Sequence, residues 1–260
     1  MKKFMALLLV AGMTLSLTAC GGSTDTAKTD QADGKDTFTV GFDQDFPPFG
    51  YVGDDGEFTG FDIEMATECA ARMGKKIVLQ PIDWDAKDME LEAGTIDCIW
   101  NGFTMNGRED QYTWTDPYMD NSQVVVVKKD SGINTLADLA GKVVEVQKES
   151  AAETALNDEE HADLMASFAQ LLSVGEYNTA FMDLESGAVD AVAIDIGVAQ
   201  FQIEGKEDQY QILDETISSE QYAVGFFLGN TALRDEVQST LLELSLIHIS
   251  EPTRHAQTSY

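Results

Sequence analysis

Short apolar strand patterns alternate with amphipathic helix patterns along most of this chain of 260 residues, and no other feature limits its fold as much. This order of elements is typical of α/β domains built on mostly parallel sheets. The alternation begins near Phe38 and starts again near Thr135. We therefore predict two α/β units of about a hundred residues each, a usual size for one compact unit.

The spacing of apolar residues and turn signals gives the expected elements of both units. The first unit should contain strands at 38–42, 77–80, 96–100 and 123–128, a helix between Gly60 and Gly74, and a helix at 86–93. The second should contain strands at 142–146, 168–174 and 189–194 and helices at 135–139, 150–156, 177–185 and 195–202. A strand at 221–228 and a helix at 231–244 should follow.

The charge balance excludes one class of partner. The chain carries 46 acidic and 16 basic residues, a formal net charge of −30. Binding to nucleic acid is not expected, because neutralising phosphates requires Lys and Arg. With three cysteines the chain is no disulfide scaffold, and Cys69 and Cys98 fit buried thiols better than a disulfide. We predict no cofactor and no metal site.

The first residues have the pattern of an export signal. Residues 1–19 combine two lysines, an apolar run at 4–17 and small residues, and this run is shorter than the ~20 residues of a membrane span. The LTAC motif ending at Cys20 resembles a bacterial lipobox, which implies cleavage before Cys20 and a lipid on its sulfur. An ordinary residue near an ordinary cleavage site is the alternative. Residues 20–36 are polar and small, so we expect a flexible, lipid-anchored tether.

The last residues differ from the rest of the chain. The segment 245–260 holds two of the three histidines and does not continue the pattern of the preceding helix. We interpret it as a frameshifted or non-native tail and assign it no function.

Candidate binding residues follow the predicted strands, where open α/β sheets bind their ligands. Arg108 lies beyond the strand at 96–100, and a guanidinium can hold a carboxylate with two parallel hydrogen bonds. Asp195 follows the strand at 189–194 and can hold an ammonium group. The alternatives are a surface ion pair between Arg108 and an adjacent acid, and an N-cap role for Asp195.

Aromatic and small residues are expected at the same edge. Phe46 and Phe49 flank a Pro-Pro pair, so that one ring can face a cavity while the other packs on the core, unless both are core residues. Trp84 follows the strand at 77–80 and forms a slot with Phe46, unless it packs between the units. The remaining candidates are Asn101, Gly102, Thr104 and Ser150. This set matches the carboxylate, ammonium and side chain of a free α-amino acid.

Several ordered motifs resemble the polar-amino-acid substrate-binding proteins of ABC importers. They include FTVGFDQDFPPFGY, GEFTGFDIEMATECAARMG, IDWDAKDMELEAGTIDCIWNGFT, TWTDPYMDNSQVVVV, ADLAGKVVEVQ and SGAVDAVAIDIGVA, and they cover about residues 37–244. The resemblance implies a two-lobed type II periplasmic-binding fold. Lobe 1 would comprise 37–125 and 219–244, and lobe 2 would comprise 126–218. Crossings near Val126-Val127 and Glu220-Gln221 would form the hinge.

The resemblance also assigns roles to the candidate residues. It implies that Phe46 and Trp84 flank the ligand side chain and that Asp195 takes the amine. Asp43 matches a position that touches basic side chains in some members. The backbone groups of the ligand would be held by Asn101, Gly102, Thr104, Arg108, Ser150 and Ala151. The chain departs from the family pattern at Glu149, where a Gly is common, and at Ala151, where a Ser or Thr is common.

The expected function is therefore the capture of a free, polar L-amino acid outside the cell and its delivery to an ABC permease and its ATPase. We expect a monomer that performs no chemistry. One alternative is a dehydratase on the same fold, with Asp43 and Asp45 as an acid–base pair. The other is a sensory module that presents its ligand to a receptor.

Overall fold

The computed structural model describes residues 36–250, which all belong to one compact unit. The predicted signal peptide at 1–19, the lipidation site Cys20 and nearly all of the predicted linker lie outside the described residues. Residues 251–260 of the predicted tail also lie outside them. Within the described part of the chain, no helix is long and apolar enough to cross a membrane.

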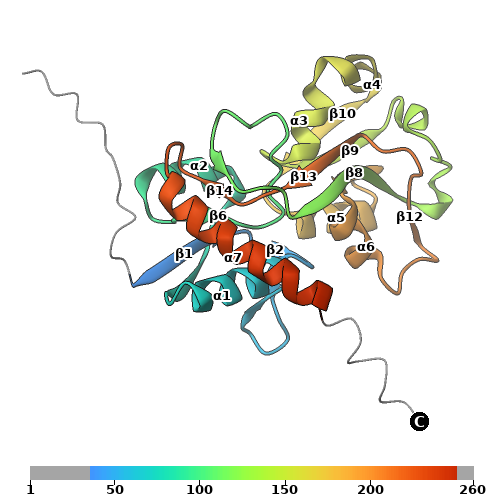
Figure 1. The fold of residues 1–260 in the computed structure, drawn as a ribbon. Helices are drawn as coiled ribbons and strands as arrows, with labels where there is room; N and C mark the ends of the chain where they lie inside the picture. The colour runs from blue at the N-terminus through green and yellow to red at the C-terminus, as the bar shows by residue number, and fades with distance from the viewer. Residues whose placement is uncertain (1–35, 251–260) are drawn as a thin grey trace, which may run out of the picture. The chain divides into compact units, whose positions relative to one another are not determined.

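The first sheet has five strands in the order β5-β1-β6-β14-β7 (Figure 1). Its parallel part is β5-β1-β6, and β14 adds to β6 in the antiparallel direction. The bounds are β1 Thr37–Phe42, β5 Lys76–Pro81, β6 Cys98–Ile99, β7 Thr113–Trp114 and β14 Gly225–Phe226. A small antiparallel sheet follows β1 and comprises β2 Asp45–Phe46, β3 Gly50–Val52 and β4 Phe58–Thr59.

The second sheet has six strands, with the path β10-β9-β11-β8-β12 and β13 paired to β8. The strands β10, β9 and β11 are parallel, whereas β8 is antiparallel to β11, β12 and β13. Both large sheets are therefore mixed around a parallel part. The bounds are β8 Met119–Lys128, β9 Val143–Gln147, β10 Gln170–Val174, β11 Ala191–Asp195, β12 Tyr210–Ile212 and β13 Ser218–Tyr222.

Two of the helices, α2 and α5, end directly at a glycine. Gly94 and Gly187 adopt the left-handed conformation directly after α2 and α5, which glycine does at little cost. The helices are α1 Phe61–Arg72, α2 Lys87–Ala93, α3 Ala151–Asn157, α4 Ala162–Ser167, α5 Tyr177–Ser186, α6 Ile196–Ile203 and α7 Thr231–Ser250. Single 3₁₀ turns lie at Trp84–Ala86, Lys129–Ser131, Leu136–Leu139 and Glu159–His161.

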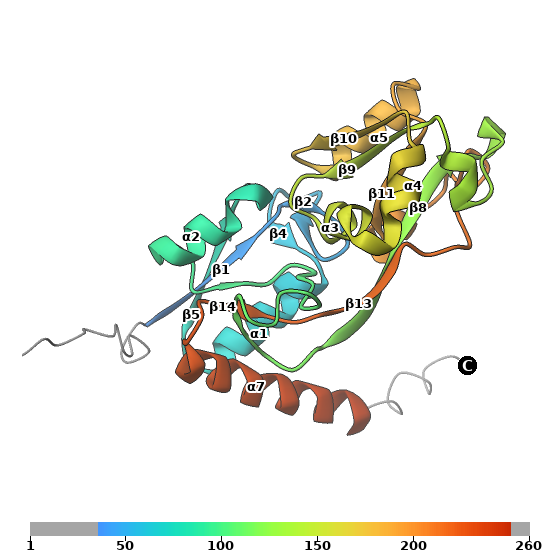
Figure 2. The same cartoon turned by 90° about the horizontal axis from the view of Figure 1, so that it is seen from above.

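Two paired strands, β8 and β13, carry the chain between the two large sheets (Figure 2). Residues 119–122 of β8 pair with β13, whereas Val126 and Val127 pair with β11 inside the second sheet. Val126 and Val127, where the sequence predicts the first crossing, therefore lie inside the second sheet. Glu220, at the second predicted crossing, lies within β13.

Several elements differ in length from the sequence-based expectation; β8, expected to begin at 123, begins at Met119. The strand expected at 221–228 is divided into β13 and β14, because the backbone N–H of Ala223 donates to Phe103, between β6 and β7, and that of Val224 donates to Thr115, between β7 and β8. The strand expected at 96–100 is only two residues long. Helix α7 continues past Leu244 to Ser250, since no proline interrupts the chain before Pro252.

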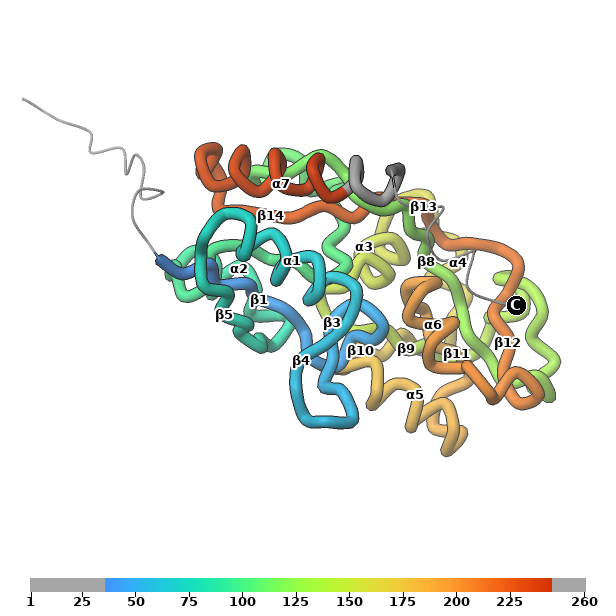
Figure 3. The backbone as a smooth tube through the Cα atoms, turned by 60° about the horizontal axis from the view of Figure 1, so that its bottom comes forward, coloured from blue at the N-terminus to red at the C-terminus, as the bar shows by residue number. Residues whose placement is uncertain are grey.

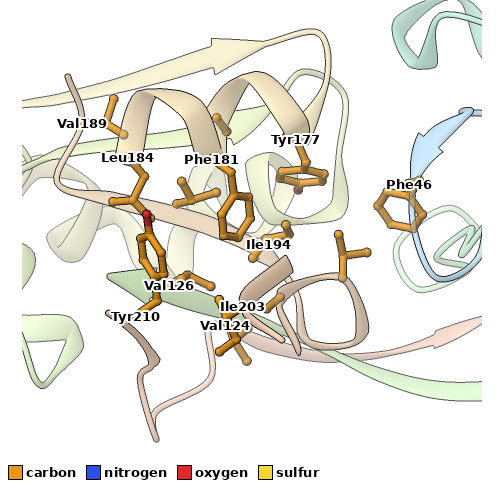
Figure 4. Packing of buried hydrophobic residues seen from close by; sticks show 14 of the residues in the cluster. Phe46, Val124, Val126, Tyr177, Phe181, Leu184, Val189, Ile194, Ile203 and Tyr210 are labelled. Atoms are coloured by element: carbon orange, nitrogen blue, oxygen red, sulfur yellow. The ribbon is translucent and has the colours of Figure 1, made fainter. Parts of the chain in front are cut away.

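Apolar side chains pack on both faces of each sheet. Beneath the first sheet, α1 and α7 lie side by side and cover a core that contains both Cys69 and Cys98 (Figure 3). One core of the second sheet lies under α5 and α6, and it also receives Phe46 and Phe49 from the segment around β2 (Figure 4). Phe46 points toward Tyr177, with ring centroids 6.1 Å apart. Phe49 also packs on Tyr222 of β13, with ring centroids 5.4 Å apart, so the segment around β2 makes apolar contact with the second sheet.

Candidate functional site

A small pocket lies where the carboxyl ends of the parallel strands from both sheets meet. Its volume is about 10 Å³, so the walls are nearly in contact. It is lined by Phe46, Trp84, Gly102, Thr104, Arg108, Gln147, Ser150, Ala151 and Asp195. Eight of the ten residues predicted for ligand binding therefore come together here, while Asp43 and Asn101 lie outside this lining.

Arg108 is held at the pocket by the backbone. Its guanidinium donates to the carbonyl of Thr104 at 3.3 Å and to the carbonyl of Glu149, from the second sheet, at 3.4 Å. The guanidinium also lies 5.4 Å from the ring centroid of Phe103. Among the described residues, no ion pair joins it to Glu109 or Asp110. A guanidinium without a carboxylate partner is suited to binding an anionic group.

Asp195 is the last residue of β11 and directly precedes α6, yet its side chain does not cap that helix. One carboxylate oxygen instead accepts hydrogen bonds from Asn121 and Gln123, each at 2.8 Å, and from the hydroxyl of Tyr222 at 2.5 Å. Burial and the nearby Glu220 carboxylate raise the pKa of Asp195 to about 7. A buried carboxylate of this kind gains most from a positively charged partner.

Gly102 owes its position to a buried carboxylate below it. Its backbone N–H donates to Asp62, near the start of α1, at 2.6 Å, and the hydroxyl of Tyr118 donates to the same oxygen at 2.9 Å. Gly102 has a φ of +58°, and a Cβ there would lie 2.8 Å from the ring of Phe46. Only glycine fits this turn without strain. Asp62 therefore supports the loop that forms one wall of the pocket.

A second, larger cavity of about 440 Å³ adjoins the first. Trp84 lines both, and the side chain of Gln147 in the small pocket donates to Asp43 of the larger cavity at 2.6 Å. Acidic side chains dominate its lining: Asp43, Asp45, Asp83, Asp85, Glu90 and Glu176. Burial raises the pKa of Asp43 to about 6, although hydrogen bonds from Asp45 and Gln147 oppose the shift.

Two predicted residues, Asn101 and Ser150, hold backbone turns beside the pocket. Asn101 accepts a hydrogen bond from the backbone N–H of Asp43 at 3.0 Å and so fixes the turn after β1. Ser150 accepts from the N–H of Glu153 at 3.1 Å, but the Glu153 carboxylate bonds the N–H of Glu149 rather than that of Ser150. Ser150 therefore caps α3, but Glu153 does not return a hydrogen bond to the N–H of Ser150. Glu149 has a φ of +61°, which explains why a glycine suits this position.

The sequence reading missed several residues around the pocket. Gln147 ends β9, and this position beyond a parallel strand was a usable signal. Tyr177, Tyr222 and Gln123 gave no such signal, because their role depends on which elements lie opposite them. All three are fully buried, and Tyr222 connects β13 to Asp195.

Polar contacts join the two sheets around the pocket. The amide of Asn178, on α5, donates to Asp45 at 2.8 Å. The ammonium group of Lys148, which follows β9, lies 2.6 Å from the Asp85 carboxylate. These contacts surround the small pocket together with the Gln147–Asp43 bond.

The described residues show no cluster of three or more His, Cys, Asp or Glu side chains that could hold a metal ion. Cys69 and Cys98 are buried free thiols. Burial raises the pKa of Cys69 to about 12, which makes its thiolate scarce.

The fold has two sheets flanked by helices and joined by a pair of strands. Charged side chains from both halves surround one pocket. This architecture defines a protein that encloses a small solute. Residues 38–246 match the bacterial extracellular solute-binding proteins, family 3, and the chain belongs to this family.

Characterised relatives of similar length support this assignment. The chain is 29% identical over 243 residues to the L-cystine-binding protein TcyJ of Escherichia coli, covering 92% of this chain and 87% of TcyJ. It is 29% identical over 247 residues to the arginine-binding extracellular protein ArtP of Bacillus subtilis, covering 94% of this chain and 93% of ArtP. These relatives are binding proteins, which favours the binding interpretation over the dehydratase.

A solved structure shows the same fold. It is an ABC uptake transporter substrate-binding protein from Streptococcus pneumoniae with bound histidine. The match has a TM-score of 0.77 and 33% sequence identity, and it covers 81% of this chain and 87% of that one. The predicted fold class, a two-lobed type II periplasmic-binding fold, is thereby confirmed.

The buried carboxylate of Asp62 makes stability depend on pH. Burial raises its pKa from the ordinary 3.8 to about 7, so the folded state binds a proton more readily than the unfolded state. The stability from this group is complete at low pH and is lost as pH rises toward 7. Relative to Asp62→Asn, the wild type should lose about 1.4 kcal/mol per pH unit between pH 5 and 7, measured by urea unfolding.

The control is Asp163→Asn, which removes one carboxylate charge at an exposed position on α4. If the free-energy difference between wild type and Asp62→Asn were constant from pH 5 to 7, Asp62 would not titrate as the structure indicates.

Proposed function

We propose that the chain is the extracellular binding component of an ABC importer and captures one free L-amino acid with a cationic side chain. The observation that carries this proposal is the pocket shared by Arg108 and Asp195, which offers one positive and one negative group to the same ligand. Arg108 would hold the α-carboxylate, and Asp195 would hold the α-ammonium group. Thr104, Ser150 and Ala151 would complete the contacts to these backbone groups.

The larger cavity supports the choice of side chain. Six acidic residues line it and none of the described lining residues is Lys or Arg. Asp85 is already paired with Lys148, but the remaining acids favour a cationic group that extends past Phe46 and Trp84. L-Cystine fits less well, because its second half carries a carboxylate as well as an ammonium group. Arginine, lysine, ornithine and histidine are therefore the preferred candidates, in agreement with the ligand named for ArtP.

Closure of two lobes on the ligand follows from the same geometry. We propose that the strand pair β8–β13 is the hinge between the two predicted lobes, and that the boundary in β8 lies before Gln123 rather than at 125–126, because β8 pairs with β11 from Gln123 onward. Arg108 precedes this pair and Asp195 belongs to the second sheet, so one ligand contacts both lobes. A ligand that contacts both lobes binds the closed form more tightly and shifts the population toward it.

The anchoring and the partners follow from the sequence. We propose that export ends with cleavage before Cys20 and that the attached lipid holds the protein at the outer face of the membrane. Two acyl chains provide stable anchoring, since each buried methylene contributes about 0.8 kcal/mol. A monomer would then deliver its ligand to the permease and ATPase of the importer. A sensory role would use the same pocket with a receptor as partner.

A thermal-shift screen of the purified protein against the amino acids, L-cystine and L-ornithine tests the proposal. A ligand present at 100 times its Kd stabilises the native state by about 2.7 kcal/mol, which should raise Tm by about 5–10 °C for a domain of this size. The shift should occur with basic L-amino acids and disappear in Arg108→Ala and Asp195→Asn.

Arg72→Ala is the matched control, because Arg72 lies on α1 and forms exposed ion pairs with Glu68 and Glu243. It should keep the full ligand-induced shift. A folded wild type that responds to no amino acid would refute the proposed function.

The acidic cavity predicts selectivity. Asp43→Asn should weaken binding of L-arginine about tenfold at pH 8, because a buried charge that interacts with the ligand is removed. Binding of L-glutamine, whose side chain is neutral, should change much less. Isothermal titration with both ligands measures this, and Asp83→Asn, an exposed acid of the same cavity, is the control. Equal losses for both ligands would mean that Asp43 does not read side-chain charge.

A further inference from the structure

Two buried carboxylates, Asp195 and Glu220, share the same hydrogen-bond donors. The side-chain nitrogen of Asn121 donates to Asp195 at 2.8 Å and to Glu220 at 2.6 Å. The side-chain nitrogen of Gln123 donates to Asp195 at 2.8 Å and to Glu220 at 2.7 Å. Asp195 is 4% exposed and Glu220 6%, so water screens neither charge effectively.

The four residues come from different parts of the fold. Asp195 ends β11 in the second sheet, while Glu220 lies on β13 directly opposite Asn121 of β8. The two amides therefore connect the pocket to the strand pair that joins the sheets. An amide nitrogen has two hydrogens, so each amide can serve both carboxylates at once.

The pair carries negative charge without a cationic partner. No ion pair among the described residues includes Asp195 or Glu220. The other ionisable groups facing them are the hydroxyls of Tyr222 and Tyr177, while Arg108 lines the same pocket. Buried like charges repel each other strongly, and a cation placed beside them is stabilised correspondingly.

We propose that Glu220 is a positioning residue of the ammonium site, which through the amides of Asn121 and Gln123 orients Asp195 and adds a second negative charge for the ligand ammonium group. This inference rests on the proposed function and assigns a role to a residue that does not line the pocket. It also connects ligand capture to the strand pair β8–β13.

The arrangement has a measurable consequence. The negative charge of Glu220 keeps a proton on Asp195 at a higher pH than burial alone would, and an arriving ammonium group displaces that proton. Affinity should therefore fall about tenfold per pH unit below pH 7, and binding at pH 6.5 should release between half a proton and one proton. The α-ammonium group of the ligand remains charged throughout this range.

The test is isothermal titration with L-arginine from pH 5.0 to 7.5, in buffers of different ionisation enthalpy, on the wild type and Glu220→Gln. Glutamine keeps an acceptor for both amides but removes the charge. We expect weaker binding at pH 7.5 by at least about fivefold, and a pH midpoint lower by about one unit. Titration of Asp43 in the neighbouring cavity is common to both proteins and cancels in the comparison.

Glu145→Gln is the matched control, since Glu145 is also a buried glutamate of the second sheet, on β9 and outside the pocket lining. It should leave both the affinity and the midpoint unchanged. An unchanged midpoint in Glu220→Gln, with or without weaker binding, would overturn the proposal, because a merely structural role alters affinity without altering the titration.

A second variant covers the possibility that Glu220→Gln does not fold. Glu220→Asp keeps the charge but shortens the side chain, so it should bind more weakly with its midpoint still near that of the wild type. If the pH midpoint of Glu220→Asp were lower than that of the wild type by about one unit, as expected for Glu220→Gln, the proposal would be overturned. If the wild type bound none of the amino acids, the proposed function itself would fail. This outcome differs from an unchanged midpoint in Glu220→Gln and from a shifted midpoint in Glu220→Asp.

Discussion

The antiparallel pairing of β8 with β13 is the constraint on which the binding site depends. Both strands belong to the second sheet, and the chain enters β8 from the first sheet and leaves β13 toward it, so their register fixes where the two sheets face each other. Arg108 reaches the pocket from the loop between β6 and β7, and Tyr222 of β13 donates to the pocket residue Asp195. Both sheets therefore contribute residues to the pocket.

The second feature of the site is a group of buried carboxylates that have no cationic partner among the described residues. Asp62, Asp195 and Asp43 are almost fully buried, and each carboxylate is held by neutral donors rather than by a cation. Burial raises the pKa of all three, which means that the fold stores an unfavourable interaction. For Asp195 and Asp43, a cationic ligand group can relieve it. The Asp62 carboxylate instead accepts a hydrogen bond from the backbone N–H of Gly102 and so holds the loop at the pocket in place.

The sequence predicted the residues that follow parallel strands and missed those that act through a partner strand. Arg108 and Asp195 could be found because the carboxyl ends of strands in such sheets meet at one edge. Glu220 and Asn121 could not, because their importance depends on the register between β8 and β13. The division of the strand expected at 221–228 has the same origin, since its hydrogen bonds go to a distant loop. Local patterns do not contain such pairings.

The most direct test of the central claim is to measure whether one ligand needs both of its α-groups. Isothermal titration would compare L-arginine with agmatine, which lacks the α-carboxylate, and with the deaminated analogue, which lacks the α-ammonium group. Loss of one partner from a buried charge pair costs about 2–5 kcal/mol, so each analogue should bind at least about thirtyfold more weakly than L-arginine. An analogue that binds as tightly as L-arginine would contradict the account, because Arg108 and Asp195 would then not be reading the two ends of one amino acid.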